Sequence, residues 1–230
     1  MKKTGLFFYP VNTSSMILFI LLGLLIAAFL INKIYFGKSA AEILEKESEK
    51  TKKIYQKDID SLISWQDQDI ELLSYHLVKK SERKGFGYSV RGIFTSVYQE
   101  NMLVFQHKKP IGRSKGFTIV ITRDHEIWYD GDKGVYVNGE YLGQINKKYQ
   151  FGNKKLRRVF GSVGGKAFNE YDILSEEGET LGSVRHPENW DMPFPRALSI
   201  YKPMDTHDLI TFKVLACMKM IEIFMAREEG

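Results

Sequence analysis

The sequence predicts a mainly β protein: a closed antiparallel barrel around a hydrophobic C-terminal helix, preceded by a transmembrane helix and a helical stalk. Three observations support this prediction. An apolar run lies near the N-terminus, short runs rich in β-branched and aromatic residues follow residue 84, and a long apolar segment comes after them. A chain of 230 residues is long enough for one substantial domain with appendages.

The net charge of +5 invites the hypothesis of a nucleic-acid partner, but its location argues against one. Residues 1–40 contain four lysines and no acidic residue, which leaves 29 bases against 28 acids in the rest of the chain. The excess charge therefore flanks the apolar run, and nucleic acid is not favoured. The single cysteine, Cys217, rules out a disulfide within the chain and a thiolate metal site.

The apolar run predicts a membrane anchor. From Met16 to Ile31 no side chain is polar, and as a helix this run spans about 24 Å. Extending it through Asn32–Phe36 reaches the roughly 30 Å of a bilayer core, which predicts a transmembrane helix at 16–36 after an N-terminal tail at 1–15. The alternative is a cleavable signal peptide with a small-residue site at Gly37–Ala41.

The lysines around this segment bear on its orientation. Lys2 and Lys3 precede it, whereas six lysines follow it by residue 53. Because basic residues accumulate on the cytoplasmic side, this asymmetry favours a single-pass protein with a cytoplasmic C-terminal domain. The opposite orientation, with the short basic N-terminus inside, stays open.

Residues 37–83 are predicted to form a helical stalk or linker. Between Ala40 and Arg83 there is neither Gly nor Pro, and Glu, Lys, Ile and Leu dominate. Two interpretations are open. The stalk self-associates or binds a partner protein through residues 40–83, or the helix packs against its own domain. The residues on the helical stripe are Ile59, Leu62, Gln66, Asp69, Leu73 and His76.

From residue 84 to 230 the pattern predicts the barrel domain. Ten short runs suit strands, and turn signals separate them. Asn138-Gly139 is the strongest of these signals, because a type I′ hairpin turn needs positive φ at both central positions. The runs are residues 88–98, 102–107, 117–122, 126–130, 134–137, 140–145, 155–163, 168–174, 179–186 and 196–201.

The last segment predicts a helix over residues 206–226. Among Leu209–Met225 only Thr211, Lys213, Lys219 and Glu222 are polar, so most of the helix circumference is apolar. A helix of this kind is buried in a core or lies in lipid. The three charged residues disfavour a membrane span, and we expect burial in the barrel with the charged groups at its rim.

A seven-residue pattern occurs twice, as "GEYLGQI" (Gly139–Ile145) and "GETLGSV" (Gly178–Val184). In each copy we expect the first Gly to form a turn, the Leu (Leu142 or Leu181) to face the core, and the second Gly (Gly143 or Gly182) to allow a kink or close backbone approach. Two unrelated hairpins that agree by chance are the alternative.

Together with the hairpin "FNEYDILSEEGETLGSV" and the helix "LITFKVLACMKMIEIFM", this repeat resembles the superfamily of tubby-like, LURP-one-related and phospholipid-scramblase-like domains. The resemblance covers residues 84–230 and implies two β-rich halves that form a closed barrel around a central C-terminal helix. This chain lacks the cysteine-rich stretch of the scramblases. The activities of those proteins are therefore not transferred to it.

A strip of bases is the strongest local candidate for a site. Asn146–Arg158 contains six bases and no acid, with Tyr149 and Phe151 between them, which suggests a basic hairpin with an aromatic tip. Bases close to an anionic membrane surface each contribute about 1 kcal/mol. An edge strand protected by lysines is the alternative. The candidate lipid- or phosphate-binding residues are Lys147, Lys148, Lys154, Lys155, Arg157 and Arg158.

No motif in the sequence predicts a catalytic or metal-binding residue, and no cofactor is expected. The five histidines are scattered, and Asp124-His125 has no accompanying nucleophile motif. We therefore expect a membrane-anchored, non-catalytic module that binds anionic lipid headgroups or a protein partner. The alternatives are a structural component of a membrane complex, acting through stalk and barrel, and an enzyme whose site assembles only in the fold.

Overall fold

The computed structural model describes residues 16–17, 19–26, 39–65, 67–85, 87–111, 116–131, 134–167, 169–190 and 194–229. The chain divides into two units, Met1–Glu42 and Ile43–Gly230. In the first unit, residues 16–17 and 19–26 are helical and exposed. Among the described residues, no helix is both long and apolar enough to cross a membrane. The predicted tail at 1–15 and the remaining residues of the predicted span at 16–36 lie outside them.

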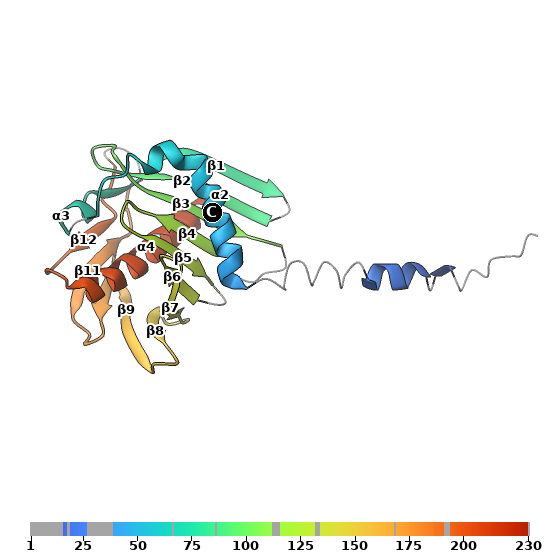
Figure 1. Cartoon of the computed structure of the whole chain (residues 1–230). Coiled ribbons are helices and arrows are strands. Elements are labelled where there is room, and N and C mark those ends of the chain that lie inside the picture. The colour runs from blue at the N-terminus through green and yellow to red at the C-terminus, as the bar shows by residue number, and fades with distance from the viewer. Residues whose placement is uncertain are drawn as a thin grey trace, which may run out of the picture. The chain divides into compact units, whose positions relative to one another are not determined.

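The second unit is mainly β, with its strands in one antiparallel sheet in the order of the sequence (Figure 1). The helices are α2 (Ala40–Ile59), α3 (Asp67–Ile70) and α4 (Thr206–Glu229). The strands are β1 (Leu73–Gly85), β2 (Gly87–Ser96), β3 (Asn101–Lys109), β4 (Phe117–Ile121), β5 (Glu126–Asp130), β6 (Gly134–Val137), β7 (Glu140–Ile145), β8 (Gln150–Asn153), β9 (Arg158–Ala167), β10 (Glu170–Ser175), β11 (Thr180–Arg185) and β12 (Leu198–Ile200).

The twelve strands make a nearly closed barrel. Between its first and last strands, Ala197 N donates to Leu73 O at 2.8 Å and Tyr75 N donates to Pro195 O at 3.2 Å. A single bridge, Ser74 to Arg196, accompanies these two bonds. The predicted fold class, a mainly β barrel with a C-terminal helix, is confirmed at this level.

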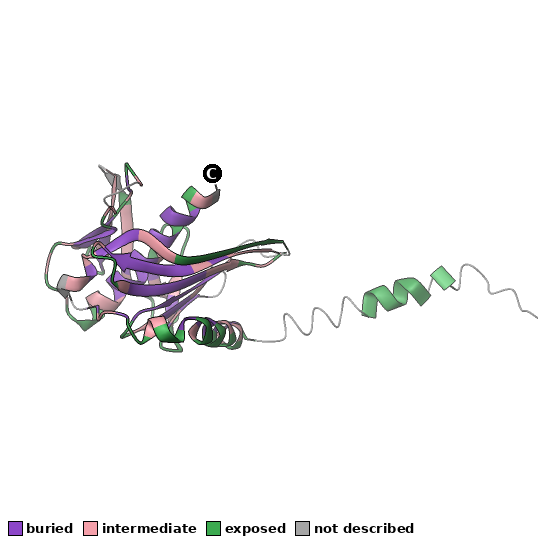
Figure 2. Cartoon of the chain, turned by 90° about the horizontal axis from the view of Figure 1, so that it is seen from above, coloured by how far each residue is buried: buried purple, intermediate pink, exposed green. Residues whose placement is uncertain are grey.

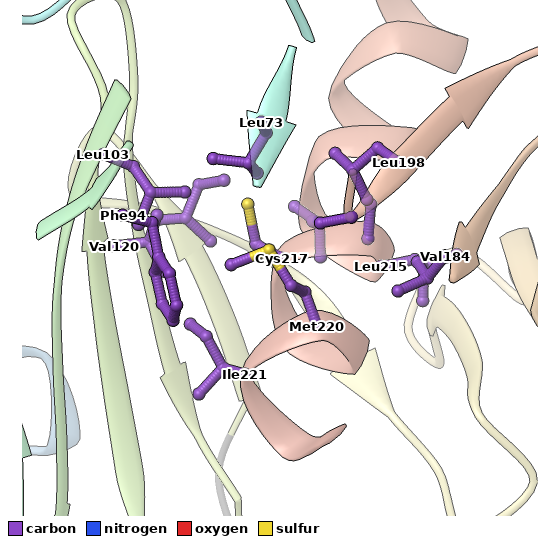
Figure 3. Packing of buried hydrophobic residues seen from close by; sticks show 14 of the residues in the cluster. Leu73, Phe94, Leu103, Val120, Val184, Leu198, Leu215, Cys217, Met220 and Ile221 are labelled. Carbon is purple, nitrogen blue, oxygen red and sulfur yellow. The ribbon is translucent and has the colours of Figure 1, made fainter. Parts of the chain in front are cut away.

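Helix α4 packs on the inner face of the sheet and fills the larger hydrophobic core (Figure 3). In Figure 3, Met220, Cys217 and Ile221 point toward Phe94, Leu103 and Val120 from the early strands. On the other side, Leu215 lies next to Val184 of β11. The Cys217 thiol is fully buried, and this burial raises its pKa to about 12, so it acts as a small apolar side chain.

The expectation that the charged groups of this helix reach the rim is wrong for its two lysines. Lys213 is 2% exposed and Lys219 is 7% exposed. The Lys219 ammonium lies 4.1 Å from the centre of the Tyr171 ring and 4.6 Å from that of Tyr149. Two aromatic faces and the Glu222 carboxylate, 3.0 Å away, compensate the loss of water around this charge.

Helix α2 packs against the outer face of the sheet, as the second interpretation of the stalk expects. Leu44 and Tyr55 belong to a second hydrophobic core with residues of β2 to β5, among them Phe117 and Ile119. Thr51 is fully buried and hydrogen-bonds Gln106 of β3 at 2.9 Å. All five residues of β4 are consequently buried, since α2 covers one face of this strand and the inner core covers the other.

The helix predicted to continue to Arg83 ends at Ile59, and β1 begins at Leu73. Leu73, Tyr75 and Leu77 alternate toward the inner core, so pairing with β2 overrides the helical propensity of this Gly-free stretch. The sheet thus starts upstream of the predicted boundary at residue 84. Figure 2 shows the strands largely buried, whereas the extended β1–β2 hairpin is exposed toward its tip. Both hydrophobic cores lie within Ile43–Gly230, as an independently folding domain requires.

The two repeat copies form the hairpins β6–β7 and β10–β11, which share a β-bulge but differ in the length of the turn. Asn138 and Gly139 have φ of 51° and 84°, as a type I′ turn requires, and Gly178 has φ of 83°. In β7, Tyr141 pairs with Tyr136 and Gly143 with Val135, which makes Leu142 the extra residue of a β-bulge. In β11, Thr180 pairs with Leu174 and Gly182 with Ile173, so Leu181 is the extra residue there.

The second glycine of each copy permits close backbone approach, as predicted. A Cβ atom on Gly143 would lie 2.3 Å from Gly152 O, and one on Gly182 would lie 2.2 Å from Ser199 O. The leucines face the core, Leu181 fully buried and Leu142 partly buried. The repeated letters therefore specify a repeated backbone geometry.

Candidate functional site

The six predicted basic residues lie on two turns at opposite ends of β8. Lys147 and Lys148 occupy the turn between β7 and β8, and Lys154, Lys155 and Arg157 occupy the turn between β8 and β9 (Figure 1). Arg158 is the first residue of β9. The prediction of one basic hairpin is therefore wrong, because the short strand β8 divides the strip into two turns.

Each of these turns begins with an asparagine that binds the backbone of the turn. Asn146 Oδ1 accepts hydrogen bonds from the N–H groups of Lys148 at 2.8 Å and Gln150 at 3.1 Å. Asn153 Oδ1 accepts from the N–H groups of Lys155 at 3.0 Å and Leu156 at 3.3 Å. Asn side chains form turns of this kind because they replace backbone acceptors locally. The two turns are thus fixed in shape from within.

Four of the six bases line one cleft of about 560 Å³: Lys147, Lys154, Arg157 and Arg158. Its lining also includes Gly131, Gly134 and Gly152, which come from three different parts of the sheet and contribute no side chain. Long basic side chains surround this space. Lys148 and Lys155, the other two predicted residues, are not part of the lining.

The charges in the cleft are unevenly paired. Arg158 Nε donates to Glu176 Oε2 at 2.6 Å, which neutralises this guanidinium in part. Within the described part of the chain, Lys147, Lys154 and Arg157 form no ion pair. One carboxylate, that of the buried Asp130, also lines the cleft. Among the described lining residues, four bases stand against one carboxylate, and guanidinium and ammonium groups are the donors that suit an anion with several acceptor oxygens.

Of the two aromatic residues of the predicted tip, Phe151 points inward, whereas Tyr149 is 37% exposed. Phe151 is 1% exposed and belongs to the inner core. Tyr149 donates its hydroxyl proton to Glu222 of α4 at 2.6 Å. Burial and this hydrogen bond to a carboxylate raise the pKa of Tyr149, so the hydroxyl stays protonated at neutral pH.

An apolar side chain that the sequence analysis did not single out projects beside the cleft. Leu156 lies in the turn between Lys155 and Arg157, and its side chain is 68% exposed. The following residue, Arg157, has φ of 52°, and Asn153 binds the backbone N–H of Leu156. The turn therefore holds this leucine in solvent with bases on both sides.

The Asp124-His125 pair takes part in contacts that hold two segments of the fold together. Asp124 Oδ2 accepts from the Ser64 hydroxyl at 2.8 Å and from the Trp65 N–H at 3.0 Å, which ties the segment after α2 to the β4–β5 turn. Burial lowers the pKa of His125, and the charge of Lys213 lowers it further. His125 Nδ1 is buried and has no hydrogen-bond partner among the described residues.

In the part of the chain that the structure describes, no group of three or more His, Cys, Asp or Glu side chains is placed to hold a metal ion. Comparison with models of protein families, with curated proteins and with solved structures gave no match. The geometry of the cleft is accordingly the starting point for a functional hypothesis.

Proposed function

We propose that this protein is a membrane-anchored, non-catalytic module that binds the phosphate of an anionic lipid headgroup in the cleft between β5 and β9. The observation that carries the proposal is the gathering of Lys147, Lys154, Arg157 and Arg158 around one glycine-lined space. Three of these bases have no ion-pair partner among the described residues, so they are available to an anion.

A lipid is favoured over a free phosphate by Leu156. An exposed apolar side chain between Lys155 and Arg157 matches a bilayer surface, where it enters the apolar layer while its neighbours contact headgroups. The apolar run Met16–Ile31 supports anchoring, and anchoring raises the effective concentration of the cleft at the membrane. The lysine asymmetry around this run supports a cytoplasmic location of the domain.

Membership of the tubby-like superfamily is part of the same proposal. Its support is the repeated hairpin and the C-terminal helix that packs inside a nearly closed antiparallel barrel. The alternative of a self-associating stalk is less favoured, because the apolar side chains Leu44 and Tyr55 of α2 pack against the sheet of the same domain.

The test is co-sedimentation of residues 39–230 with vesicles of phosphatidylcholine alone and vesicles that also contain phosphatidylserine, over a series of salt concentrations. This fragment keeps both hydrophobic cores, all twelve strands and the Ser39 side chain that hydrogen-bonds the first turn of α2. We expect binding only to the anionic vesicles, with affinity that falls as salt rises.

A matched pair of variants separates the cleft from general surface charge. Replacing Lys147, Lys154 and Arg157 with Gln should weaken binding by about 3 kcal/mol, since each base contributes about 1 kcal/mol. Replacing Lys46, Lys53 and Lys57 with Gln removes the same charge from the exposed side of α2, outside the cleft and its two turns, and should weaken binding much less. Equal losses of affinity in the two variants would mean that the whole basic surface, and not the cleft, attracts the vesicles. Absence of binding at low salt would reject the proposal.

A further inference from the structure

A second cavity, of about 460 Å³, lies inside the barrel between α4 and the inner face of the sheet. Most of its helix wall is apolar, formed by Leu215, Met218, Ile221, Met225 and Ala226, and Lys219 and Glu222 complete it. Val163 of β9 continues this wall on the sheet. Two of these residues are methionines, whose flexible side chains adapt to ligands of different shape. The volume is within the range of about 300–1,000 Å³ that is common for small-molecule sites.

The charged groups beside this cavity neutralise one another. Glu222 accepts a hydrogen bond from the Tyr149 hydroxyl at 2.6 Å and from the Lys219 ammonium at 3.0 Å. Lys219 is also held between the rings of Tyr149 and Tyr171. Across the cavity, the side chains of His107 and Thr118 hydrogen-bond each other at 3.0 Å. A ligand in this space therefore meets mainly apolar surface and paired polar groups.

The inner cavity adjoins the outer cleft. Tyr129, Ile145, Asn146 and Lys147 line both spaces, so the end of β7 and the beginning of the next turn form their common wall. A basic space and an apolar space that meet at Lys147 fit the two chemical parts of a lipid.

We propose that the two cavities form one site for a single lipid molecule, whose phosphate lies in the outer cleft and whose acyl chain enters the cavity beside α4. This inference rests on the proposed function and deepens it, because it makes the ligand an individual lipid with an inserted chain. The alternative is a headgroup contact at a membrane surface with the chain left in the bilayer.

The test is isothermal titration of residues 39–230 with glycerol phosphate and with lysophosphatidic acids of increasing chain length, all below their micelle concentrations. Affinity should rise about fourfold for each methylene that the cavity buries, and then stay constant once the cavity is full. Constant affinity from glycerol phosphate to the longest chain would overturn the inference and leave headgroup binding standing. Absence of binding by every probe would overturn the proposed function together with the inference.

Variants that fill the cavity from its two walls check the location. Met218→Trp on α4 and Val163→Phe on β9 should each remove most of the gain with chain length. Neither should change the affinity for glycerol phosphate, whereas the Lys147, Lys154 and Arg157 variant should lose it. Circular dichroism identifies a variant that does not fold. If one of the two cavity-filling variants fails to fold, the chain-length series of the other one tests the inference. An unchanged chain-length series in a folded cavity-filling variant would contradict the inference.

Discussion

The two repeat hairpins share a bulged leucine and a glycine close to the next strand, but they differ in their surroundings. Around β10–β11, Gly182 meets the backbone of Ser199 in β12, and the Phe212 ring of α4 would lie 2.8 Å from an added Cβ. Around β6–β7, Gly143 meets the backbone of Gly152 in the four-residue strand β8. The second copy is thus sealed by core residues, while the first copy borders the basic cleft.

This difference shows how one sequence pattern can serve stability in one half of the barrel and leave room for a site in the other. The pattern accompanies a first glycine of positive φ, a bulged leucine and a close approach of the next strand in both copies. The residues that pack beyond that next strand are not set by the pattern. The first two predictions below compare the two copies directly, and the last two test the half of the barrel that holds the cleft. The measurement is chemical denaturation of residues 39–230 unless another one is named.

The leucines should give the largest contrast. Leu181→Ala should destabilise the domain by about 4 kcal/mol, because Leu181 is fully buried and the substitution leaves a cavity in the inner core. Leu142→Ala should cost about 2 kcal/mol, since this side chain is only partly buried. Equal losses would mean that the two halves are equally well packed.

The second glycines should give the next contrast. Gly182→Ala should cost about 3 kcal/mol, because its Cβ collides with a strand that is held between β11 and the first residues of β1. Gly143→Ala should cost about 1 kcal/mol, since β8 pairs with β7 through only Gln144 and Ile145 and can move toward the cleft. A larger loss for Gly143→Ala would contradict the view that the first half is the more adaptable.

Acidification should lower the stability of the domain through His125, which lies in the turn between β4 and β5. Because burial lowers the pKa of His125 below its ordinary value of 6.5, the unfolded chain takes up a proton there before the folded protein does. Stability should therefore be constant above about pH 6.5 and fall as the pH decreases toward the lowered pKa. His125→Gln should reduce this fall. An unchanged pH profile in this variant would assign the effect to another group, such as His76, whose pKa burial also lowers.

The smallest effect on stability is expected at Leu156. Leu156→Asp should change the free energy of unfolding by less than about 0.5 kcal/mol, because the side chain contacts little of the protein. The same variant should bind anionic vesicles several-fold more weakly in co-sedimentation, and Leu156→Met serves as its control. Full binding by Leu156→Asp would exclude insertion of this turn into the bilayer.

The strands were largely predictable from local patterns. All ten predicted runs overlap a strand, because alternation and turn residues are local properties of the sequence. Two strands were missed for different reasons. In β1, charged residues after Leu77 conceal the alternation of the first residues, and in β8 only four residues separate two turns.

The candidate site was predictable only in part. The basic residues stand out in the sequence, yet Asp130, Gly131 and Gly134 join them through strand pairing across β6 and β7. The direction of the Tyr149 side chain depends on its hydrogen bond to Glu222, which is far away in the sequence. The close approach between β7 and β8 depends on Gly143 and Gly152 together. These are long-range contacts, and no local pattern contains them.

Helix α4 has a consequence for how the protein is made. Every strand of the barrel leaves the ribosome before the helix that fills the inner core, so the apolar inner faces of β2 to β5 have no partner while translation continues. A nascent sheet of this kind exposes strands that associate readily with other chains. The domain therefore completes its folding only after α4 emerges. Until then, its exposed apolar strands are the kind of surface that chaperones bind.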